Sequence, residues 1–444
     1  MSAIRALLLV ILLAVPRVLW ADLRLSLTRT RTTVSSSTLG QTGGHDELSV
    51  VLGKDYFWID LADYRRIYDF RRERIYTLHP ASRTYLDDSL QSIVAHREVE
   101  MRSRMGLGPF EPIKQIPIGR NRQFELAHLF GMIIEGMDVP EPVEEVRGNP
   151  RRFTHQGRLV GAYELGETAL PDDLRRVYAR FITYECSLHP SIHRKLCQEP
   201  RLFKSIREVA HMGDARRVTV LELSEVASVQ PADKLVPDGY RLGPEPGNTD
   251  PVLAIICSVV NGTAKRPDMT PGKLRGLIDG ALKEGHYGQA IVYYFQGMLQ
   301  FGEEDIELLQ KISDAAGNDP EFLLFNVGVR RNSKAQAERA IFALDAIDRS
   351  KLKSAWVLDV YKADALSTAG RIWESKALLI KTLRTNPHLA GAYKDLGGIL
   401  FSTFDMPGAW RCWETCLRLC PKYPLLQRFG YYQERRRKRF PDFF

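Results

Sequence analysis

The first part of the chain alternates apolar and polar side chains with the period of β-strands. Over residues 23–34, leucines first alternate with polar residues, and then Thr and Val dominate. Three aromatic-rich runs follow, separated by short breaks: Tyr56–Leu61, Arg65–Phe70 and Arg74–His79. This spacing predicts an antiparallel meander of strands.

Helical periods appear after this meander and alternate with further strand-like runs. Helices are expected at 90–104, at 121–135 and over an amphipathic stretch that begins near Leu174. Strand-like runs are expected at 143–147, 153–156, 158–165 and 217–229. Together these elements predict an α+β domain over residues 22–245, with helices packed on an antiparallel, curved sheet.

A stretch with two prolines and two glycines, Gly243–Asp250, separates this domain from an all-helical half. Asp250 is expected to cap a helix that has Pro251 at its first position. About ten helices are predicted from there to the end of the chain, stacked in pairs. The second predicted domain is therefore all-α and covers residues 250–440.

The helix pair predicted at residues 390–423 follows a 34-residue pattern. Counted from Ala390, eight positions agree in type or nearly so: Tyr393, Leu396, Gly397, Leu400, Ala409, Trp413, Cys416 and Pro421. The pattern resembles the tetratricopeptide repeat, a helix–turn–helix unit in which small residues lie where helices cross. Similar patterns begin at Pro271 and, more weakly, at Trp356.

The tetratricopeptide resemblance implies a binding groove. Such arrays present the first helix of each pair on a concave surface. By position, the groove-lining candidates are Arg275 and Asp279 in one repeat, and Lys394, Gly398 and Phe401 in another. The two cations favour a protein or peptide segment with acidic groups or a C-terminal carboxylate as the partner. The alternative is that these positions are merely solvated.

The aromatic meander, together with the Pro-x-Gly-Tyr element at 237–240, resembles the periplasmic lipoprotein-carrier type of domain and its exported relatives. In those domains a curved antiparallel sheet wraps helices and leaves an apolar cavity. The resemblance implies a cavity for a lipid or acyl chain, with Phe57, Ile59, Ile67 and Tyr76 as lining candidates. A filled core at these residues would favour a scaffold instead of a carrier.

An export signal is predicted at residues 1–21. Arg5 supplies the positive start, residues 6–15 are continuously apolar, and Ala21 is the expected last residue before cleavage. The apolar run is too short to span a bilayer. The alternative is an uncleaved N-terminal anchor. We therefore expect an exported protein, periplasmic or secreted.

Six cysteines are present, and disulfides persist in the oxidising compartments that exported proteins reach. Cys186 and Cys197 are close in sequence and separated by Pro190, so a disulfide between them is the leading interpretation. Two unpaired thiols are the second. With His189 and His193 the pair also has the ligand types of a zinc site, but ligands along one continuous helix do not converge on one ion. No metal is expected.

No motif for catalysis or cofactor binding is present. The sequence lacks a Gly-rich phosphate loop, a Gly-x-Ser-x-Gly elbow and a His-Glu-x-x-His pair. We expect neither a cofactor nor an enzymatic activity. The net charge of +8 is compatible with nucleic acid, anionic membranes or acidic partners, but an exported protein rarely meets nucleic acid.

The run Arg435–Arg439 holds five basic residues near the end of the chain. It is open to two interpretations: the cations complement a helix dipole, or they contact anionic lipid headgroups. The leading functional hypothesis is a protein-interaction scaffold in the cell envelope. The alternative is a carrier or sensor that holds a lipid or another apolar ligand in the first domain.

Overall fold

The computed structural model describes residues 21–35, 41–108, 116–146, 148–212, 215–245, 247–265, 269–302 and 304–444. The predicted export signal lies outside the described residues, apart from Ala21. By its contacts the chain divides into two compact units that alternate along the sequence. The sheet unit comprises Met1–Ala81, Met105–Tyr240 and Phe440–Phe444, and the helical unit comprises Ser82–Arg104 and Arg241–Arg439. The predicted domains, residues 22–245 and 250–440, are ranges expected to fold separately. These ranges stay predictions.

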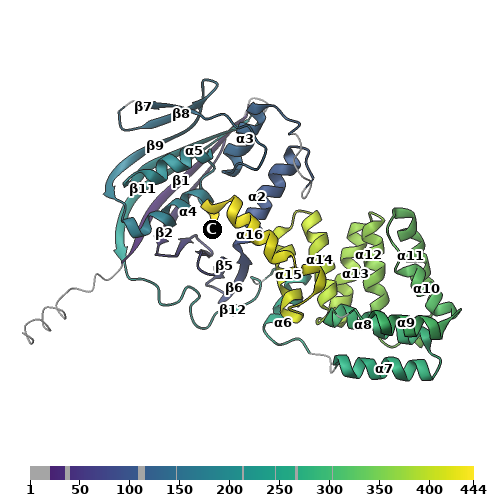
Figure 1. Ribbon diagram of the computed structural model, residues 1–444. Helices are drawn as coiled ribbons and strands as arrows, with labels where there is room; N and C mark the ends of the chain where they lie inside the picture. The colour runs from purple at the N-terminus through teal and green to yellow at the C-terminus, as the bar shows by residue number, and fades with distance from the viewer. Residues whose placement is uncertain are drawn as a thin grey trace, which may run out of the picture. The chain divides into compact units, whose positions relative to one another are not determined.

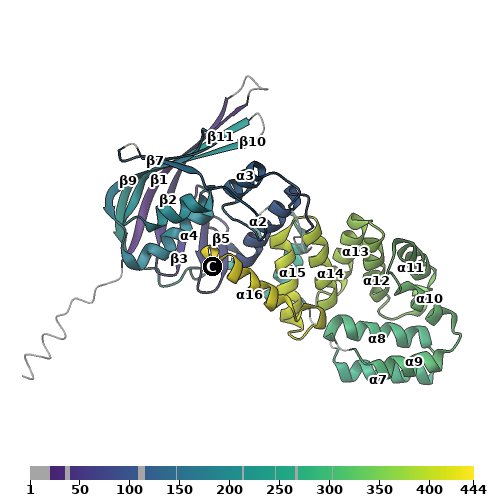
Figure 2. The ribbon, with the colours of Figure 1, turned by 45° about the horizontal axis from the view of Figure 1, so that its top comes forward.

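Ten of the described strands belong to the sheet unit. Their neighbours pair antiparallel in the order β5-β4-β3-β2-β1-β11-β10-β9-β8-β7. The strands are β1 (Asp22–Ser35), β2 (Gln41–Leu52), β3 (Tyr56–Asp60), β4 (Arg65–Asp69), β5 (Arg74–His79), β7 (Val143–Val146), β8 (Arg151–His155), β9 (Arg158–Ala169), β10 (Arg201–Met212) and β11 (Ala215–Val229). The sheet is strongly twisted (Figures 1 and 2). The predicted α+β class and the predicted antiparallel sheet are confirmed.

Three helices longer than one turn accompany the sheet among the described residues of this unit. They are α3 (Arg120–Phe130), α4 (Arg175–Glu185) and α5 (Pro190–Gln198), and η1 (Asp172–Leu174) and η4 (Pro441–Phe443) are short 3-10 helices. Helices α4 and α5 lie over one face of the sheet in both views (Figures 1 and 2). Helix α3 ends earlier than the expected 135 because Gly131 adopts a left-handed conformation, with φ of 63°.

The helical unit contains a two-residue parallel pairing of strands and a series of helices. Strands β6 (Thr84–Ser89) and β12 (Arg241–Leu242) pair in parallel. The helices are α2 (Leu90–Arg104), α6 (Pro251–Val260), α7 (Pro271–Lys283), α8 (Tyr287–Phe301), α9 (Ile306–Ala316), α10 (Pro320–Gly328), α11 (Lys334–Ala346), α12 (Trp356–Thr368), α13 (Ile372–Thr385), α14 (Ala390–Ser402), α15 (Met406–Leu419) and α16 (Phe429–Arg439), with η2 (Arg349–Lys351) and η3 (Pro424–Leu426) between them. None of the described helices is both long and apolar enough to cross a bilayer.

Two local predictions about these helices agree with the structure. The Asp250 carboxylate accepts a hydrogen bond from the Val252 amide at 2.9 Å, and Pro251 is the first residue of α6. In the final pattern, a Cβ atom on Gly397 would collide with the Trp413 indole. The small residue and the aromatic therefore meet where α14 and α15 cross.

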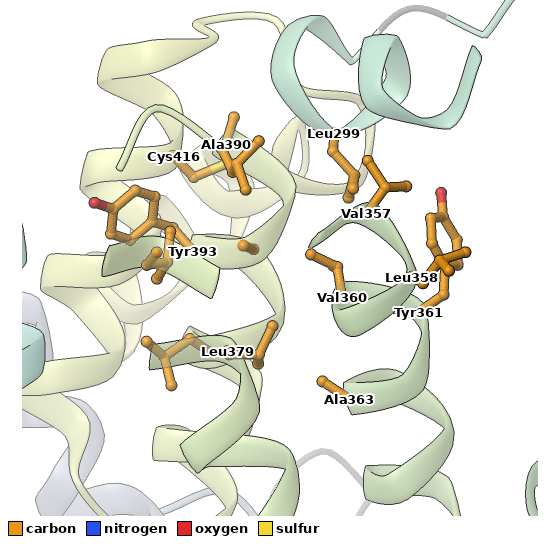
Figure 3. Packing of buried hydrophobic residues seen from close by; sticks show 14 of the residues in the cluster. Leu299, Val357, Leu358, Val360, Tyr361, Ala363, Leu379, Ala390, Tyr393 and Cys416 are labelled. Atoms are coloured by element: carbon orange, nitrogen blue, oxygen red, sulfur yellow. The ribbon is translucent and has the colours of Figure 1, made fainter. Parts of the chain in front are cut away.

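Neighbouring helices pack as the pairs α7–α8, α10–α11, α12–α13 and α14–α15, but α8 also packs across α10, α12 and α14. Its Phe295 ring lies 4.8 Å from Phe325 and 4.9 Å from Tyr361. Leu299 of α8 points toward Val357 of α12 (Figure 3). Because α8 is buried nearly all round, it is a central core helix of this unit.

Candidate functional site

An aromatic cluster joins strands β3 and β4 to helix α4 in the sheet unit. Its members are Phe57, Tyr68, Phe70, Phe181 and Tyr184. The Phe57 ring lies 4.3 Å from Tyr68, 5.8 Å from Phe70 and 5.6 Å from Phe181. The Tyr184 ring lies 4.9 Å from Tyr68 and 6.1 Å from Phe70. Such contacts contribute about 0.5–1.5 kcal/mol each beyond the apolar area that they bury.

One more aromatic side chain enters this cluster from the other end of the sequence. Phe443 is 2% exposed, and its ring stands edge-on to Tyr184 with centroids 5.4 Å apart. The Tyr184 hydroxyl donates to the Phe443 carbonyl at 3.0 Å. Arg176 donates to the Phe444 carbonyl at 3.3 Å. Segment 440–444 is therefore held along α4 by its backbone as well as by an aromatic ring.

Helix α4 presents three hydrogen-bond donors on one face beside this cluster. Arg176, Arg180 and Tyr184 are spaced by four residues and so lie one above another. Arg180 as a residue is 5% exposed, and its guanidinium lies 4.3 Å from the centre of the Phe70 ring. Burial, and secondly the charge of Arg176, lower the pKa of Arg180 to about 10. An anion placed here would offset both effects.

The four predicted cavity-lining residues do not share one cavity. Residues directly opposite each other on paired strands lie on the same face of a sheet. Ile67 pairs with Trp58 and Tyr76, whereas Phe57 pairs with Tyr68. Phe57 and Ile59 therefore face one side and Ile67 and Tyr76 the other, which corrects the prediction. All four are buried, and only Phe57 belongs to the aromatic cluster.

Tyr68, Arg180, Tyr184 and Phe443 are not among the site residues predicted from the sequence. The spacing of Arg176, Arg180 and Tyr184 on one amphipathic helix was a usable signal. The contact between Tyr184 and Phe443 could not be predicted from a local sequence pattern, because 259 residues separate them.

The groove candidates on α7 form exposed ion pairs. Arg275 pairs with Asp305, and Asp279 pairs with Lys311 at 2.9 Å. Lys311 lowers the pKa of Asp279 through its hydrogen bond. In the structure both side chains contact α9 or its N-cap, and their assignment to a partner-binding groove stays a prediction.

The groove candidates on α14 have three different environments. Lys394 pairs with its neighbour Asp395, and Gly398 is exposed with open space beside it. Phe401 is 7% exposed, and its ring lies 5.7 Å from Trp413, so it is a core residue and its assignment to the groove is corrected. In addition, α8 packs against α7, α12 and α14. These are the first helices of the predicted repeats, whose faces the repeat resemblance assigns to partner binding.

Cys186 and Cys197 are free thiols, so the predicted disulfide is not present in the structure. Each thiol has its own buried surroundings. Burial raises the pKa of Cys186, and Glu208 lies close enough to share a hydrogen bond with it. Burial also raises the pKa of Cys197 to about 12, with Asp442 as its acidic neighbour. Within the described ranges, no three His, Cys, Asp or Glu side chains form a group that could hold a metal ion.

A second aromatic group in the sheet unit contains three buried or half-buried histidines. The Phe124 ring stacks on His155 at 3.8 Å, on His189 at 4.9 Å and on His128 at 6.1 Å. One ring nitrogen of each histidine is buried without a hydrogen-bond partner. Burial lowers the pKa of His128 and that of His189 to about 4. The imidazoles of His128 and His189 are therefore neutral at pH 7.

The basic run at the end of α16 is partly turned inward. Arg436 and Arg439 both pair with Glu98 of α2, at 3.1 and 3.0 Å. Arg436 also lies 5.4 Å above the Trp410 ring. Arg437 pairs with Glu434 at 2.9 Å. The run as a whole is thus not a free basic patch.

No family model matches the sequence, and no curated protein does either. One similar solved structure is a putative outer membrane lipoprotein-sorting protein domain from Vibrio parahaemolyticus, at 8% identity and a TM-score of 0.22, over 48% of this chain and 88% of that one. Another is lipovitellin in a study of lipid–protein interactions, at 12% identity and a TM-score of 0.20, over 90% of this chain and 46% of that one. Likenesses at these scores carry no argument about function, and the tetratricopeptide resemblance stays a prediction.

Proposed function

We propose that the sheet unit is a carrier or sensor for an amphiphile with an apolar chain and an anionic head. The ligand takes the place of Phe443 against the aromatic cluster and brings its head to Arg176 and Arg180. One observation carries the proposal: the cluster accepts an aromatic side chain from a distant segment, beside two cations on one helix face. With the predicted export signal, we expect this function in the cell envelope or outside the cell.

The apolar part of the ligand follows from the energetics of Phe443. Burying a phenylalanine side chain contributes about 1.5–3 kcal/mol, whereas each buried methylene contributes about 0.8 kcal/mol. An acyl chain that buries four or more methylenes can therefore compete with Phe443. A long-chain ligand satisfies this condition, and a short-chain one does not.

The anionic head follows from the two arginines. A guanidinium binds a carboxylate or a phosphate through paired hydrogen bonds. Arg180 is almost fully buried over Phe70, and burial disfavours its charge. A bound anion stabilises this charge, so the site favours a fatty acid over its neutral ester.

Native mass spectrometry after incubation with palmitate or with methyl palmitate tests this proposal. We expect a one-to-one palmitate adduct, a weaker adduct with the ester, and a smaller preference for palmitate in Arg180→Gln. Phe342→Ala, a change at an exposed aromatic of the helical unit, serves as the control and leaves the adduct unchanged. No adduct with either ligand would contradict the proposal.

A second candidate function, protein-interaction scaffold, is favoured by the exposed side chains of the helical unit. Among the described residues, Phe342 on α11 is 77% exposed and Trp373 on α13 is 71% exposed. Exposed aromatics of this size are typical of protein-binding surfaces. A photo-crosslinker at position 373 that captures one defined protein, and loses it in Phe342→Ala, would support this function. Equal capture in both would count against it.

A further inference from the structure

Helix α16 exposes one continuous face that combines tyrosines with cations. Arg428 precedes the helix by one residue, and Tyr431, Tyr432, Arg435 and Lys438 follow at spacings of three and four, so these five side chains share one face. Tyr431 and Tyr432 are 63% and 47% exposed, with rings 5.7 Å apart. We call these five residues the α16 face.

The short helix η3, which precedes α16 in the sequence, carries an exposed apolar side chain. Leu425 is 70% exposed there, an unusual fraction for a leucine. Lys422, just before η3, is exposed as well.

The charges of the α16 face are of one sign. Arg428, Arg435 and Lys438 lie on it, and no acidic residue does. Glu434 lies at its edge and contacts Lys438 at 3.6 Å. The face thus carries a net positive charge around its two tyrosines.

Ion pairs of two neighbouring cations help to fix the orientation of α16. Arg436 and Arg439 pair with Glu98, whose side chain is 11% exposed, and Arg436 lies above the Trp410 ring. These contacts bind two cations of the basic run to α2 and α15. They determine which basic side chains of α16 remain exposed. The sequence of the run alone does not distinguish the exposed side chains from the paired ones.

We infer that the α16 face docks on an anionic lipid bilayer. Tyrosine rings prefer the headgroup region of a membrane, where the ring is in apolar surroundings and the hydroxyl is in water. Lysine and arginine side chains are attracted to the negative surface potential of anionic lipids. The inference does not rest on the proposed amphiphile site, because it uses residues of the helical unit alone.

Vesicle sedimentation tests this inference on the full chain. We expect binding to phosphatidylcholine vesicles with about 30% phosphatidylglycerol, and little binding to phosphatidylcholine alone. Replacing one cation should lower the partition coefficient about fivefold, so Arg428→Gln with Lys438→Gln should lower it about thirtyfold. The matched control is Lys283→Gln with Lys334→Gln, which removes the same charge from exposed positions on α7 and α11.

A second variant separates the contribution of the tyrosines. Tyr431→Ser with Tyr432→Ser should weaken binding while leaving its dependence on salt unchanged. Three results would overturn the inference: equal binding to neutral vesicles, equal losses in the test and control cation variants, or self-association without lipid that Tyr431→Ser abolishes. The last result would assign the α16 face to a second copy of the chain.

Discussion

Arg411 of α15 and Asp88 of β6 form a two-pronged ion pair. The guanidinium Nε lies 2.7 Å from one carboxylate oxygen, and Nη2 lies 3.0 Å from the other. The two side chains are only 16% and 14% exposed. Burial lowers the pKa of Arg411, but Asp88 outweighs this effect and the net pKa is raised. This pair anchors residues 82–104 within the helical unit.

Asp88→Asn should destabilise the helical unit strongly. Asp88 contributes more to compensating the Arg411 charge than Asp405 and Asp250 do, and losing one partner of a shielded pair costs about 3 kcal/mol. Chemical denaturation measures the change in the free energy of unfolding. Asp88→Asn combined with Arg411→Met should be less destabilised than the single variant. Glu374→Gln, in the exposed pair of Glu374 with Arg371, should leave stability unchanged; a similar loss in both variants would contradict this account.

The histidines around Phe124 should make the sheet unit sensitive to acid. The pKa of His128 falls from 6.5 in the unfolded chain to about 4 in the folded one. The unfolded chain therefore binds the proton first, so stability is complete above pH 6.5 and is lost as the pH falls toward 4. His189 acts in the same direction.

His128→Gln should remove part of this acid sensitivity. Glutamine can still donate to the Val209 carbonyl, the partner of His128 at 3.1 Å, but it does not titrate. Between pH 7.5 and pH 4 the wild type should lose about 3 kcal/mol more than the variant. Thermal unfolding at a series of pH values checks this. Parallel pH profiles for the two proteins would show that His128 is not the cause.

Glu208 should have the opposite dependence on pH. Burial raises its pKa from 4.5 to about 7, although hydrogen bonds from Cys186 and Ser187 act in the other direction. The folded chain therefore holds the proton more tightly, so this contribution to stability is complete below pH 4.5 and is lost as the pH rises through 7.

Glu208→Gln should accordingly gain stability relative to the wild type as the pH is raised. The difference in unfolding free energy between pH 8 and pH 4 should be about 3 kcal/mol in favour of the variant. Glu222→Gln, at an exposed position on β11, is the control and should show no such trend. If Glu208→Gln follows the control, Glu208 is ionised in the folded state.

Features encoded within a few residues could be read from the sequence. The apolar alternation in β1, the cap at Asp250 and the contact between Gly397 and Trp413 each depend on local spacing. Local spacing also identified α4, which positions the candidate site. These features were predictable because strands, helix caps and helices are each encoded by residues a few positions apart.

Features set by pairing between distant segments could not be read in this way. Whether Ile67 shares a face with Phe57 depends on the register between β3 and β4. Whether Cys186 reaches Cys197 depends on where the α4 and α5 packing directs each thiol. The position of Phe443 depends on a segment that contacts α4 although more than two hundred residues separate them in the sequence. No local period records such contacts.

Displacement of Phe443 is the most direct test of the amphiphile site. The measurement is the affinity of a fluorescent long-chain fatty acid for wild type, Phe443→Ala and Phe342→Ala. Removing the Phe443 ring frees an area whose burial contributes about 1.5–3 kcal/mol, so Phe443→Ala should bind at least about tenfold more tightly than the other two proteins. Equal affinities would show that the ligand binds elsewhere. No binding to any of the three would contradict the proposed function itself.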